Sequence, residues 1–174
     1  ILPIFLMALL GMMDLGFQFY AQHILNGAVN QAARKSTLEL YADDPSALDS
    51  SVEAKVKTLL KYGVVTFDRK SYREFSKVGK EEPYVDSNRN GRYDRGECFE
   101  DMNASGSWEA DMGKAGNGGA DDVVLYTVDV SYTRLFPFWS TFAQTQEAKL
   151  KATTVLRNQP FANNHAMHPE KICT

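Results

Sequence analysis

The chain has little of what catalytic and nucleic-acid-binding proteins usually need. Only two cysteines and three histidines occur, and the net charge at pH 7 is −3. The sequence contains no glycine-rich phosphate loop, no nucleophile elbow and, outside one polar segment, no paired-carboxylate or Cys/His constellation. Its Lys and Arg residues are too scattered for a nucleic-acid groove or a polybasic membrane patch. We therefore expect neither an enzyme nor a nucleic-acid-binding protein.

The two cysteines, Cys98 and Cys173, are far apart in the sequence and fit no metal or redox motif. In an extracytoplasmic domain, a disulfide that closes the C-terminal tail onto the middle of the chain is the simplest interpretation. Two unrelated buried thiols are the alternative. His165 and His168 with the nearby Glu170 could be drawn as a metal cluster, but this tail is rich in Pro and Asn and has no regular period to orient them. We do not expect a metal site there.

One long apolar run is present, at the start of the chain. It extends from Ile1 to Met13 without a charged side chain, and Pro3 falls in the first turn of a helix, where its missing N–H does no harm. After Gly16 the apolar residues recur at helical spacing and form one stripe. The stripe consists of Phe17, Ala21, Ile24, Leu25, Ala28, Val29 and Ala32. A helix through about residue 42 would be roughly 60 Å long, about twice the hydrocarbon thickness of a bilayer. Residues 1–42 therefore predict a membrane segment that continues as an amphipathic stalk.

The apolar run is short for a membrane span, since it reaches only Met13, or about Tyr20 if Asp14 is tolerated. This length is also near that of a signal-peptide core, but no small-residue cleavage site follows, so we expect the segment to be retained. The chain starts at Ile1 without Met, which predicts that upstream residues are processed off or missing. A carboxylate at Asp14 is costly in hydrocarbon unless it is paired, protonated or near the interface. Either Asp14 caps a short span at the interface, or it contacts another subunit in a helical bundle.

The rest of the chain, residues 43–174, predicts one globular α+β head. A turn at 43–46 starts a short amphipathic helix that ends near Gly63, and a polar segment at 79–122 interrupts the strands that follow. In the clearest strand, 123–135, strict alternation puts one set of side chains on one face: Val124, Tyr126, Val128, Val130 and Tyr132. Further expected elements are strands at 64–67, 72–78 and 149–157 and an aromatic turn or short helix at 136–139. We therefore expect a long N-terminal helix followed by a small antiparallel sheet with one or two helices packed on it.

The polar segment contains a motif with the spacing of an EF-hand calcium loop. Between Asp86 and Glu97, oxygen-bearing side chains occupy positions 1, 3, 5, 9 and 12 of the loop, and Gly91 occupies position 6. Alternate residues of such a tight loop point inward, glycine allows the sharp bend, and the last Glu can bind the ion with both oxygens. The candidate calcium ligands are Asp86, Asn88, Asn90, Asp94 and Glu97, with the backbone carbonyl of Arg92 at position 7. A solvated acidic turn is the alternative.

A weaker copy of the motif follows directly. Its candidate ligands are Asp101, Asn103, Ser105, Ser107 and Glu109, with Gly106 at the bend. Met112 falls where the closing carboxylate is needed, and Asp111 is the candidate substitute. This loop is either a second calcium site or a polar loop folded against the first one. Because no long amphipathic helices flank the loops, we expect a structural calcium clip rather than a sensor, and millimolar extracellular calcium would keep even a weak site filled.

Two segments of the chain resemble the TadE-like proteins, the minor pilins or pseudopilins of the tight-adherence (Tad, or Flp) pilus. They are LPIFLMALLGMMDLGFQFYAQHILNGAVNQAAR near the start and LKATTVLRNQPF near the end. The positions that match the family pattern are Leu2–Pro3, Asp14, Tyr20–Gln22, Ala32–Arg34 and Arg157–Pro160. Family members are cut by a prepilin peptidase just ahead of a short segment that ends in Glu-Phe, and that Glu is absent here. The calcium loops would be a feature of a subgroup.

The resemblance implies a type IV pilin-like protein whose N-terminal helix anchors it in the bacterial inner membrane until assembly. The helix would then pack with other pilins in a filament or an initiation complex, with the pilus assembly machinery as a further partner. Asp14 would pair with a neighbouring subunit's N-terminal amine or a basic group. The calcium-stabilised head would lie in the periplasm and later at the cell surface. The alternative is a bitopic periplasmic calcium-binding module that recruits an envelope partner and never enters a filament.

Overall fold

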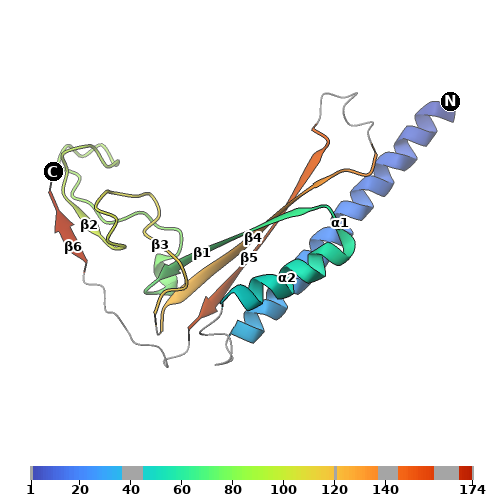
Figure 1. Ribbon diagram of the computed structural model, residues 1–174. Helices are drawn as coiled ribbons and strands as arrows, with labels where there is room; N and C mark the ends of the chain where they lie inside the picture. The colour runs from blue at the N-terminus through green and yellow to red at the C-terminus, as the bar shows by residue number, and fades with distance from the viewer. Residues whose placement is uncertain (1, 37–44, 120, 137–144, 159–168, 174) are drawn as a thin grey trace. The chain divides into compact units, whose positions relative to one another are not determined.

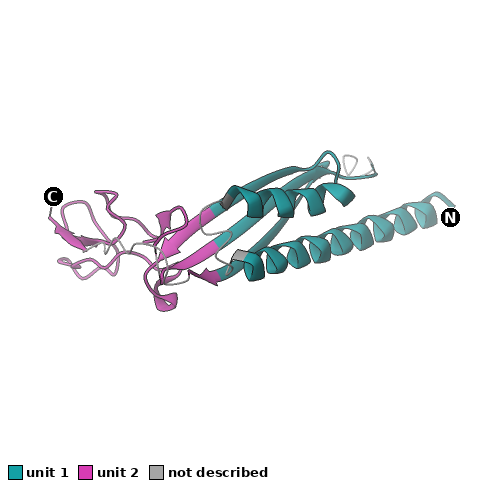
Figure 2. Cartoon of the chain, turned by 60° about the horizontal axis from the view of Figure 1, so that its bottom comes forward, with its two compact units in different colours: residues 1–68, 126–155 teal, residues 69–125, 156–174 magenta. Residues whose placement is uncertain are grey.

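The computed structural model divides the chain into two compact units (Figure 2). Unit 1 contains residues 1–68 and 126–155, and unit 2 contains residues 69–125 and 156–174. Structure is described for residues 2–36, 45–119, 121–136, 145–158 and 169–173.

Unit 1 contains two helices and the larger part of three long strands (Figure 1). Helix α1 spans Leu2–Ser36 and helix α2 spans Pro45–Leu59, with Pro45 at the first helical position, where it is well tolerated. The two helices pack against each other. Apolar side chains at helical spacing bury the inner face of α2 and the turn after it: Leu48, Val52, Val56 and Leu60.

The main sheet has the strand order β3-β1-β4-β5. Its strands are β1 (Val64–Tyr72), β3 (Lys114–Ala115), β4 (Val123–Thr133) and β5 (Glu147–Arg157). On β4 the predicted apolar face is buried, and it carries the ring of Tyr126, whose hydroxyl donates to Asp49 of α2, and that of Tyr132, which contacts Phe17 of α1. Since Tyr126 and Tyr132 lie on the same side of the strand, both helices cover one face of the sheet in unit 1.

Unit 2 contains a second, two-stranded sheet. Strand β2 (Phe99–Asp101) pairs antiparallel with β6 (Glu170–Ile172), and Phe99 lies opposite Ile172. Strand β3 pairs antiparallel with the end of β1, so that Lys70 lies opposite Ala115. The polar segment between β1 and β4 forms loops around these short strands.

Most of the predicted elements are confirmed, and one is wrong. The α+β fold class, the long apolar N-terminal helix, the strand at 123–135 and the last strand are present. The strand predicted at 72–78 is absent, because the chain leaves β1 at Tyr72 and forms a 3₁₀ helix, η2, over Phe75–Lys77. The predicted helix end near residue 42 and most of the aromatic turn at 136–139 lie outside the described residues. The boundary predicted at residue 42 does not separate the compact units, since α1 packs with α2 in unit 1.

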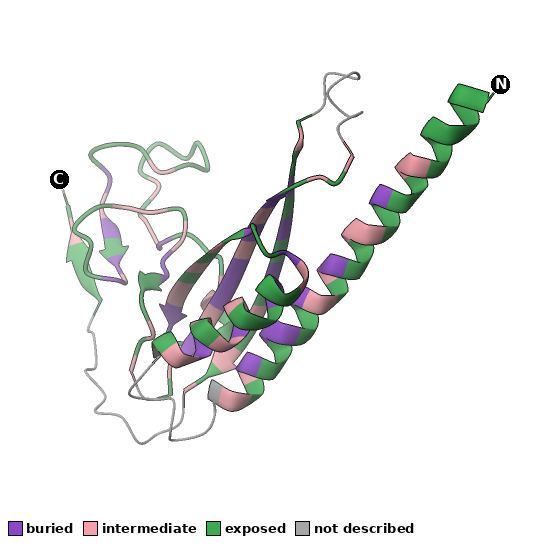
Figure 3. Ribbon diagram, turned by 45° about the vertical axis from the view of Figure 1, so that its right-hand side comes forward, coloured by how far each residue is buried: buried purple, intermediate pink, exposed green. Residues whose placement is uncertain are grey.

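Helix α1 has two parts that differ in burial (Figure 3). From Asp14 onward, one stripe of the helix is buried against the rest of unit 1; it consists of Asp14, Ala21, Leu25, Ala28, Val29 and Ala32. Before Asp14 the described residues are exposed or half-buried. The amphipathic stripe predicted from helical spacing is therefore covered by the chain's own α2 and sheet.

Candidate functional site

The outer surface of α1 is apolar from one end of the predicted membrane segment to beyond Asp14. Its exposed large apolar side chains are Leu2, Ile4, Phe5, Leu6, Met7, Leu9, Met12, Met13, Leu15, Phe19 and Tyr20. By length and composition, α1 qualifies as a helix that could cross a membrane. The exposed surface between Leu2 and Tyr20 is about 28 Å long at the rise of an α-helix, close to the thickness of a bilayer's hydrocarbon core.

Asp14 does not interrupt this apolar surface, because its side chain is directed into unit 1. It is only 2% exposed, and its Oδ2 accepts a hydrogen bond of 2.7 Å from Nη1 of Arg134, directly after β4. Gln18, one helical turn further along α1, accepts a second, longer bond of 3.4 Å from the same nitrogen. The structure thus gives Asp14 a partner within the chain, and the sequence contained a hint of it: Arg134 is a basic residue at the end of the most regular strand.

Tyr132 is a further polar residue of this region. Burial raises the pKa of its hydroxyl, and the negative charge of Asp14 raises it further, while Arg134 acts in the opposite direction. The ring makes an edge-on contact with Phe17 at 6.0 Å between centroids. Tyr132 of β4 and Arg134 directly after β4 therefore contact an apolar and a charged side chain of α1 at the level of Asp14.

The first predicted cation loop has the backbone turn that an EF-hand-like loop needs. The Asp86 carboxylate accepts the N–H groups of Asn90 at 3.1 Å and Gly91 at 2.8 Å, so the first residue of the loop holds the bend. At the other end, the two oxygens of Glu97 accept the N–H groups of Ser87 at 2.8 Å and Asp94 at 3.0 Å. Gly91 has a φ of 76°, which favours glycine at this position.

Side chains inside the first loop converge on one another. The amide groups of Asn88 and Asn90 both donate to Oδ2 of Asp94, each at 2.6 Å. Positions 3, 5 and 9 of the loop therefore point to a common interior. In the described residues, His, Cys, Asp and Glu alone form no group of three that could hold a metal ion; the ligand set of such a loop also draws on Asn, Ser and a backbone carbonyl.

The second loop makes the same turn. Asp101 accepts the N–H groups of Ser105 at 3.1 Å and Gly106 at 2.8 Å, and the amide of Asn103 donates to Glu109. The side chains of Asp101, Asn103 and Glu109 thus make bonds like those of Asp86, Asn88 and Asp94 in the first loop.

Asp111, the predicted closing carboxylate of the second loop, lies elsewhere. Its two oxygens accept from Nζ of Lys70 at 2.6 Å and from the hydroxyl of Tyr72 at 2.9 Å. Burial alone would raise the pKa of Asp111, but the bonds from Lys70, Tyr72 and the N–H of Gly113 together lower it. Asp111 therefore belongs to an ion pair with β1 and does not turn toward the loop.

The carboxylate that closes the second loop is Glu82, which the sequence analysis missed. Its Oε1 accepts the N–H of Met102 at 2.8 Å, and its Oε2 accepts the N–H of Glu109 at 3.1 Å. The residue is 0% exposed. Burial raises the pKa of Glu82, the two N–H bonds lower it, and the charges of Asp101 and Glu109 raise it. The available signal was spacing, since Glu82 precedes Asp86 as Glu97 precedes Asp101.

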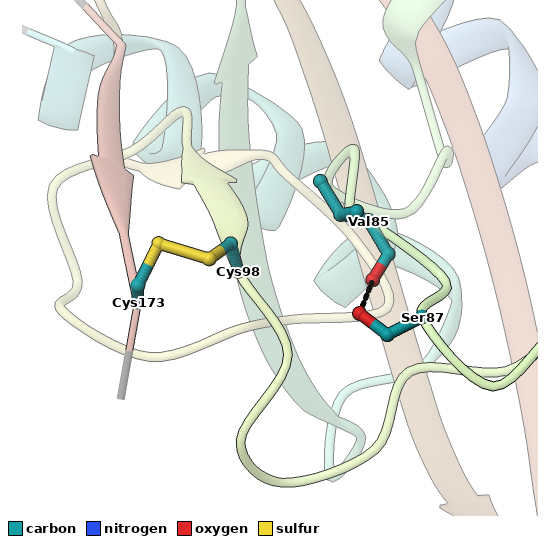
Figure 4. Close-up of a disulfide and its surroundings, with 4 residues drawn as sticks. All are labelled: Val85, Ser87, Cys98 and Cys173. Carbon is teal, nitrogen blue, oxygen red and sulfur yellow. Dashed lines mark hydrogen bonds between the residues drawn. A yellow bond between two sulfur atoms is a disulfide. The ribbon is translucent and has the colours of Figure 1, made fainter.

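The predicted disulfide is present and lies beside these loops (Figure 4). Cys98 follows Glu97 directly and Cys173 follows β6; their Sγ atoms are 2.08 Å apart and their Cα atoms 4.1 Å apart. The bond joins the C-terminal tail to the loop segment, next to the hydrogen bond of 3.4 Å that the Ser87 hydroxyl donates to the carbonyl of Val85. The alternative of two unrelated thiols is therefore excluded. His165 and His168 lie outside the described residues.

Comparison with known proteins identifies only the N-terminal helix. The sequence model of the family described as TadE-like protein matches residues 1–34. No curated protein and no solved structure matches the chain. The matched residues include the exposed apolar surface and all of the buried stripe of α1, Asp14 among it. The predicted resemblance is confirmed over this segment, so the N-terminal helix of the chain is similar to that of TadE-like proteins.

Proposed function

We propose that this protein is a minor pilin, or pseudopilin, of a Tad pilus, inserted in the bacterial inner membrane through α1 and assembled through the same helix. The observation that carries the proposal is the coincidence of two properties in one element. The TadE-like match covers residues 1–34, and the same helix presents an exposed apolar surface from Leu2 to Tyr20. A helix of this kind suits both a bilayer and a bundle of like helices.

The part of α1 from Met12 to Tyr20 supports assembly rather than a membrane anchor alone. Here one side of the helix packs on the chain's own strand β4, through Phe17 and Tyr132, while the other side leaves Leu15 and Phe19 exposed. A large exposed apolar surface beside a folded head normally marks a contact with another molecule. In a filament, neighbouring pilin helices would cover this side.

Asp14 has a role in this proposal through its pair with Arg134. A charge buried in an ion pair does not face lipid or a neighbouring apolar helix, so the pair keeps the outer face of α1 uniformly apolar. We expect Asp14→Ala to reduce filament assembly while leaving membrane insertion unchanged. Arg134→Ala should do the same if the pair acts within the chain. Loss of assembly with Asp14→Ala alone would instead indicate a contact with a neighbouring subunit's amine or basic group.

The polar segment of unit 2 supplies the second part of the proposal, a calcium ion bound in the loop from Asp86 to Glu97. The support is the loop's ligand spacing together with the backbone bonds that orient its first and last carboxylates. The candidate ligands are Asp86, Asn88, Asn90, the carbonyl of Arg92, Asp94 and Glu97. The ion would supply positive charge and coordination at the centre of the loop and so stabilise the head.

The decisive experiment is mass spectrometry of sheared surface filaments beside the washed inner-membrane fraction of cells that produce the chain. A pilin is expected in both fractions, and Asp14→Ala is expected in the membrane fraction alone. Absence of the wild-type chain from filaments, with normal amounts in the membrane, would contradict a filament role. That outcome would favour a bitopic periplasmic calcium-binding module, an alternative supported by the position of the loops outside the TadE-like match.

A further inference from the structure

The two cation loops belong to a tandem repeat that begins before the first loop. Residues 82–96 read EPYVDSNRNGRYDRG, and residues 97–111 read ECFEDMNASGSWEAD. Both segments carry Glu, an aromatic residue, Asp, Asn, Gly and a second aromatic residue in the same order and at the same spacing. The equivalent pairs are Glu82 and Glu97, Tyr84 and Phe99, Asp86 and Asp101, Asn88 and Asn103, Gly91 and Gly106, and Tyr93 and Trp108.

The backbone follows the same path in both repeats. Arg89 and Ala104 occupy equivalent positions and have φ values of 61° and 63°, in a region where residues other than glycine are uncommon. The glycines two residues later have φ values of 76° and 77°. The weaker second motif therefore has the conformation of the first, although it lacks a closing carboxylate of its own.

Each repeat closes the loop of the other. Glu97 opens the second repeat, but its carboxylate accepts the N–H groups of Ser87 and Asp94 in the first loop. Glu82 opens the first repeat, and it accepts the equivalent N–H groups of the second loop, those of Met102 and Glu109.

The backbone N–H groups of the two glutamates repeat this exchange. That of Glu97 donates to the carbonyl of Asp94 at 3.0 Å, and that of Glu82 donates to the carbonyl of Glu109 at 3.1 Å.

Backbone and aromatic contacts hold the two repeats together. Val85 N–H donates to the Cys98 carbonyl, and Glu100 N–H donates to the Pro83 carbonyl, each at 2.8 Å. Val85 is equivalent to Glu100, and Cys98 is equivalent to Pro83, so each repeat donates one of these bonds to the other. Tyr84 and Phe99 form a β-bridge between the two bonds.

The second aromatic residues of the two repeats also contact each other. Tyr93 and Trp108 stack with their ring centroids 4.7 Å apart. The repeats are thus related by a local two-fold axis, which brings Glu82 to the second loop as it brings Glu97 to the first.

The charge at the second loop points to a cation. Glu82 is 0% exposed and Asp101 is 5% exposed, and the only hydrogen bonds described for the Glu82 carboxylate come from backbone N–H groups. No Lys or Arg in the described ranges forms an ion pair with Glu82, Asp101 or Glu109; the ion pairs there involve other carboxylates. Buried carboxylates without compensating positive charge are strongly unfavourable. A divalent cation would compensate them.

We propose that the second loop is a calcium site closed by Glu82, so that unit 2 binds two calcium ions through ligands exchanged between the repeats. The ligands of the second ion are Glu82, Asp101, Asn103, Ser105, the carbonyl of Ser107 and Glu109. This proposal rests on the calcium ion proposed for the first loop. Each closing glutamate lies two residues before a member of the bridged pair Tyr84 and Phe99, which joins the repeats. Binding at one loop therefore orders the other, and the two ions bind with positive cooperativity.

The test is calcium titration of the full chain in detergent, with stoichiometry measured by isothermal titration calorimetry and native mass spectrometry. Wild type should bind two ions and Glu82→Gln one. Glu81→Gln is the matched control, because it makes the same charge change at an exposed neighbour and should leave two ions bound. If Glu82→Gln fails to form the Cys98–Cys173 disulfide, Asp101→Asn replaces it as the variant that should bind one ion.

The outcomes separate this inference from the proposed function. Two ions bound to Glu82→Gln and to Asp101→Asn with wild-type affinity would overturn the role of Glu82 and leave the first site intact. A single ion bound to wild type and lost in Asp86→Ala would also overturn the second site alone. No calcium bound to wild type would overturn both sites, while the proposed pilin role would still depend on the filament experiment.

Discussion

The ion pair of Asp14 and Arg134 determines how a charged residue in α1 affects the stability of the fold. The side chains are 2% and 17% exposed, so both charges are largely removed from water. Such a pair is favourable only while both partners are present, because each desolvated charge alone costs several kcal/mol. Gln18 adds a second acceptor for Arg134 and helps to satisfy the guanidinium.

Removing either partner should destabilise unit 1, and the two losses should differ. Arg134→Ala leaves Asp14 buried without its partner and should cost about 3–5 kcal/mol in the free energy of unfolding. Asp14→Ala should cost less, because the longer Arg134 side chain can reach water. Denaturant unfolding of the full chain in detergent measures both losses, and the double variant should lose less than their sum. Strict additivity would contradict a direct interaction.

Replacing Asp111 tests whether this carboxylate is a calcium ligand of the second loop. Its bonds to Lys70 and Tyr72 are partly exposed to solvent, so Asp111→Ala should cost only about 1–2 kcal/mol in the free energy of unfolding. The number of bound calcium ions should not change. Calcium titration and denaturant unfolding of the same sample check both expectations. A lost calcium ion would return Asp111 to the ligand set.

Glu82 and Asp111 show which contacts the spacing of a loop motif does not predict. The turn of the first loop could be predicted from the sequence, because its candidate ligands follow one another at fixed spacing from Asp86. The closing group of the second loop comes from upstream, and its approach depends on the pairing of Tyr84 with Phe99, a contact between repeats. Spacing within one loop contains no information about such a contact.

At the level of elements, α1 combines two surfaces with different partners. The stripe that includes Leu25 and Val29 packs inside unit 1, while the opposite side remains apolar and exposed as far as Tyr20. A helix that is apolar on several sides and buried on one needs a second apolar environment. In the proposed function, the bilayer supplies it before assembly and other pilin helices supply it afterwards.

Two leucines of α1 separate these surfaces experimentally. Leu25 is 1% exposed and Leu9 is 52% exposed. Leu25→Ala should lower the free energy of unfolding by about 2–5 kcal/mol, because it opens a cavity in the packed stripe. Leu9→Ala should change head stability little, since the Leu9 side chain is largely exposed. Thermal unfolding of both variants in detergent compares them, and equal losses would contradict the division of α1 into a packed and an exposed part.

The long elements could be predicted and the short ones could not, for a physical reason. Residues 123–133 and the stripe from Ala21 to Ala32 carry many apolar side chains at the period of their own element, so local pattern and burial agree. Strands β2, β3 and β6 contain three residues or fewer, and distant segments determine their pairing. The false strand at 72–78 had weak alternation, and its residues turn into a 3₁₀ helix instead.

At the level of the whole molecule, the two units depend on different sources of stability. Unit 1 has helices packed on a sheet face, whereas the segment 79–122 of unit 2 is dense in Asp, Asn and Gly and poor in aliphatic residues. A segment that buries little apolar surface needs another constraint to stay folded. The Cys98–Cys173 disulfide is one such constraint, and it encloses a long stretch of chain, with a sequence separation of 75. The proposed calcium ions are the other.

Calcium removal should therefore destabilise the protein even with the disulfide intact. Excess chelator should lower the melting temperature of the full chain by several degrees, because an ion that binds only the folded state adds stability in proportion to the logarithm of its concentration over Kd. Asp86→Ala should have a lowered melting temperature in calcium and a weaker response to chelator. Magnesium should restore little, since it requires tighter octahedral coordination than a flexible loop of this kind provides. Differential scanning calorimetry with and without each ion measures these shifts. An unchanged melting temperature in excess chelator would remove calcium from the stability of unit 2 and leave the disulfide as its main constraint.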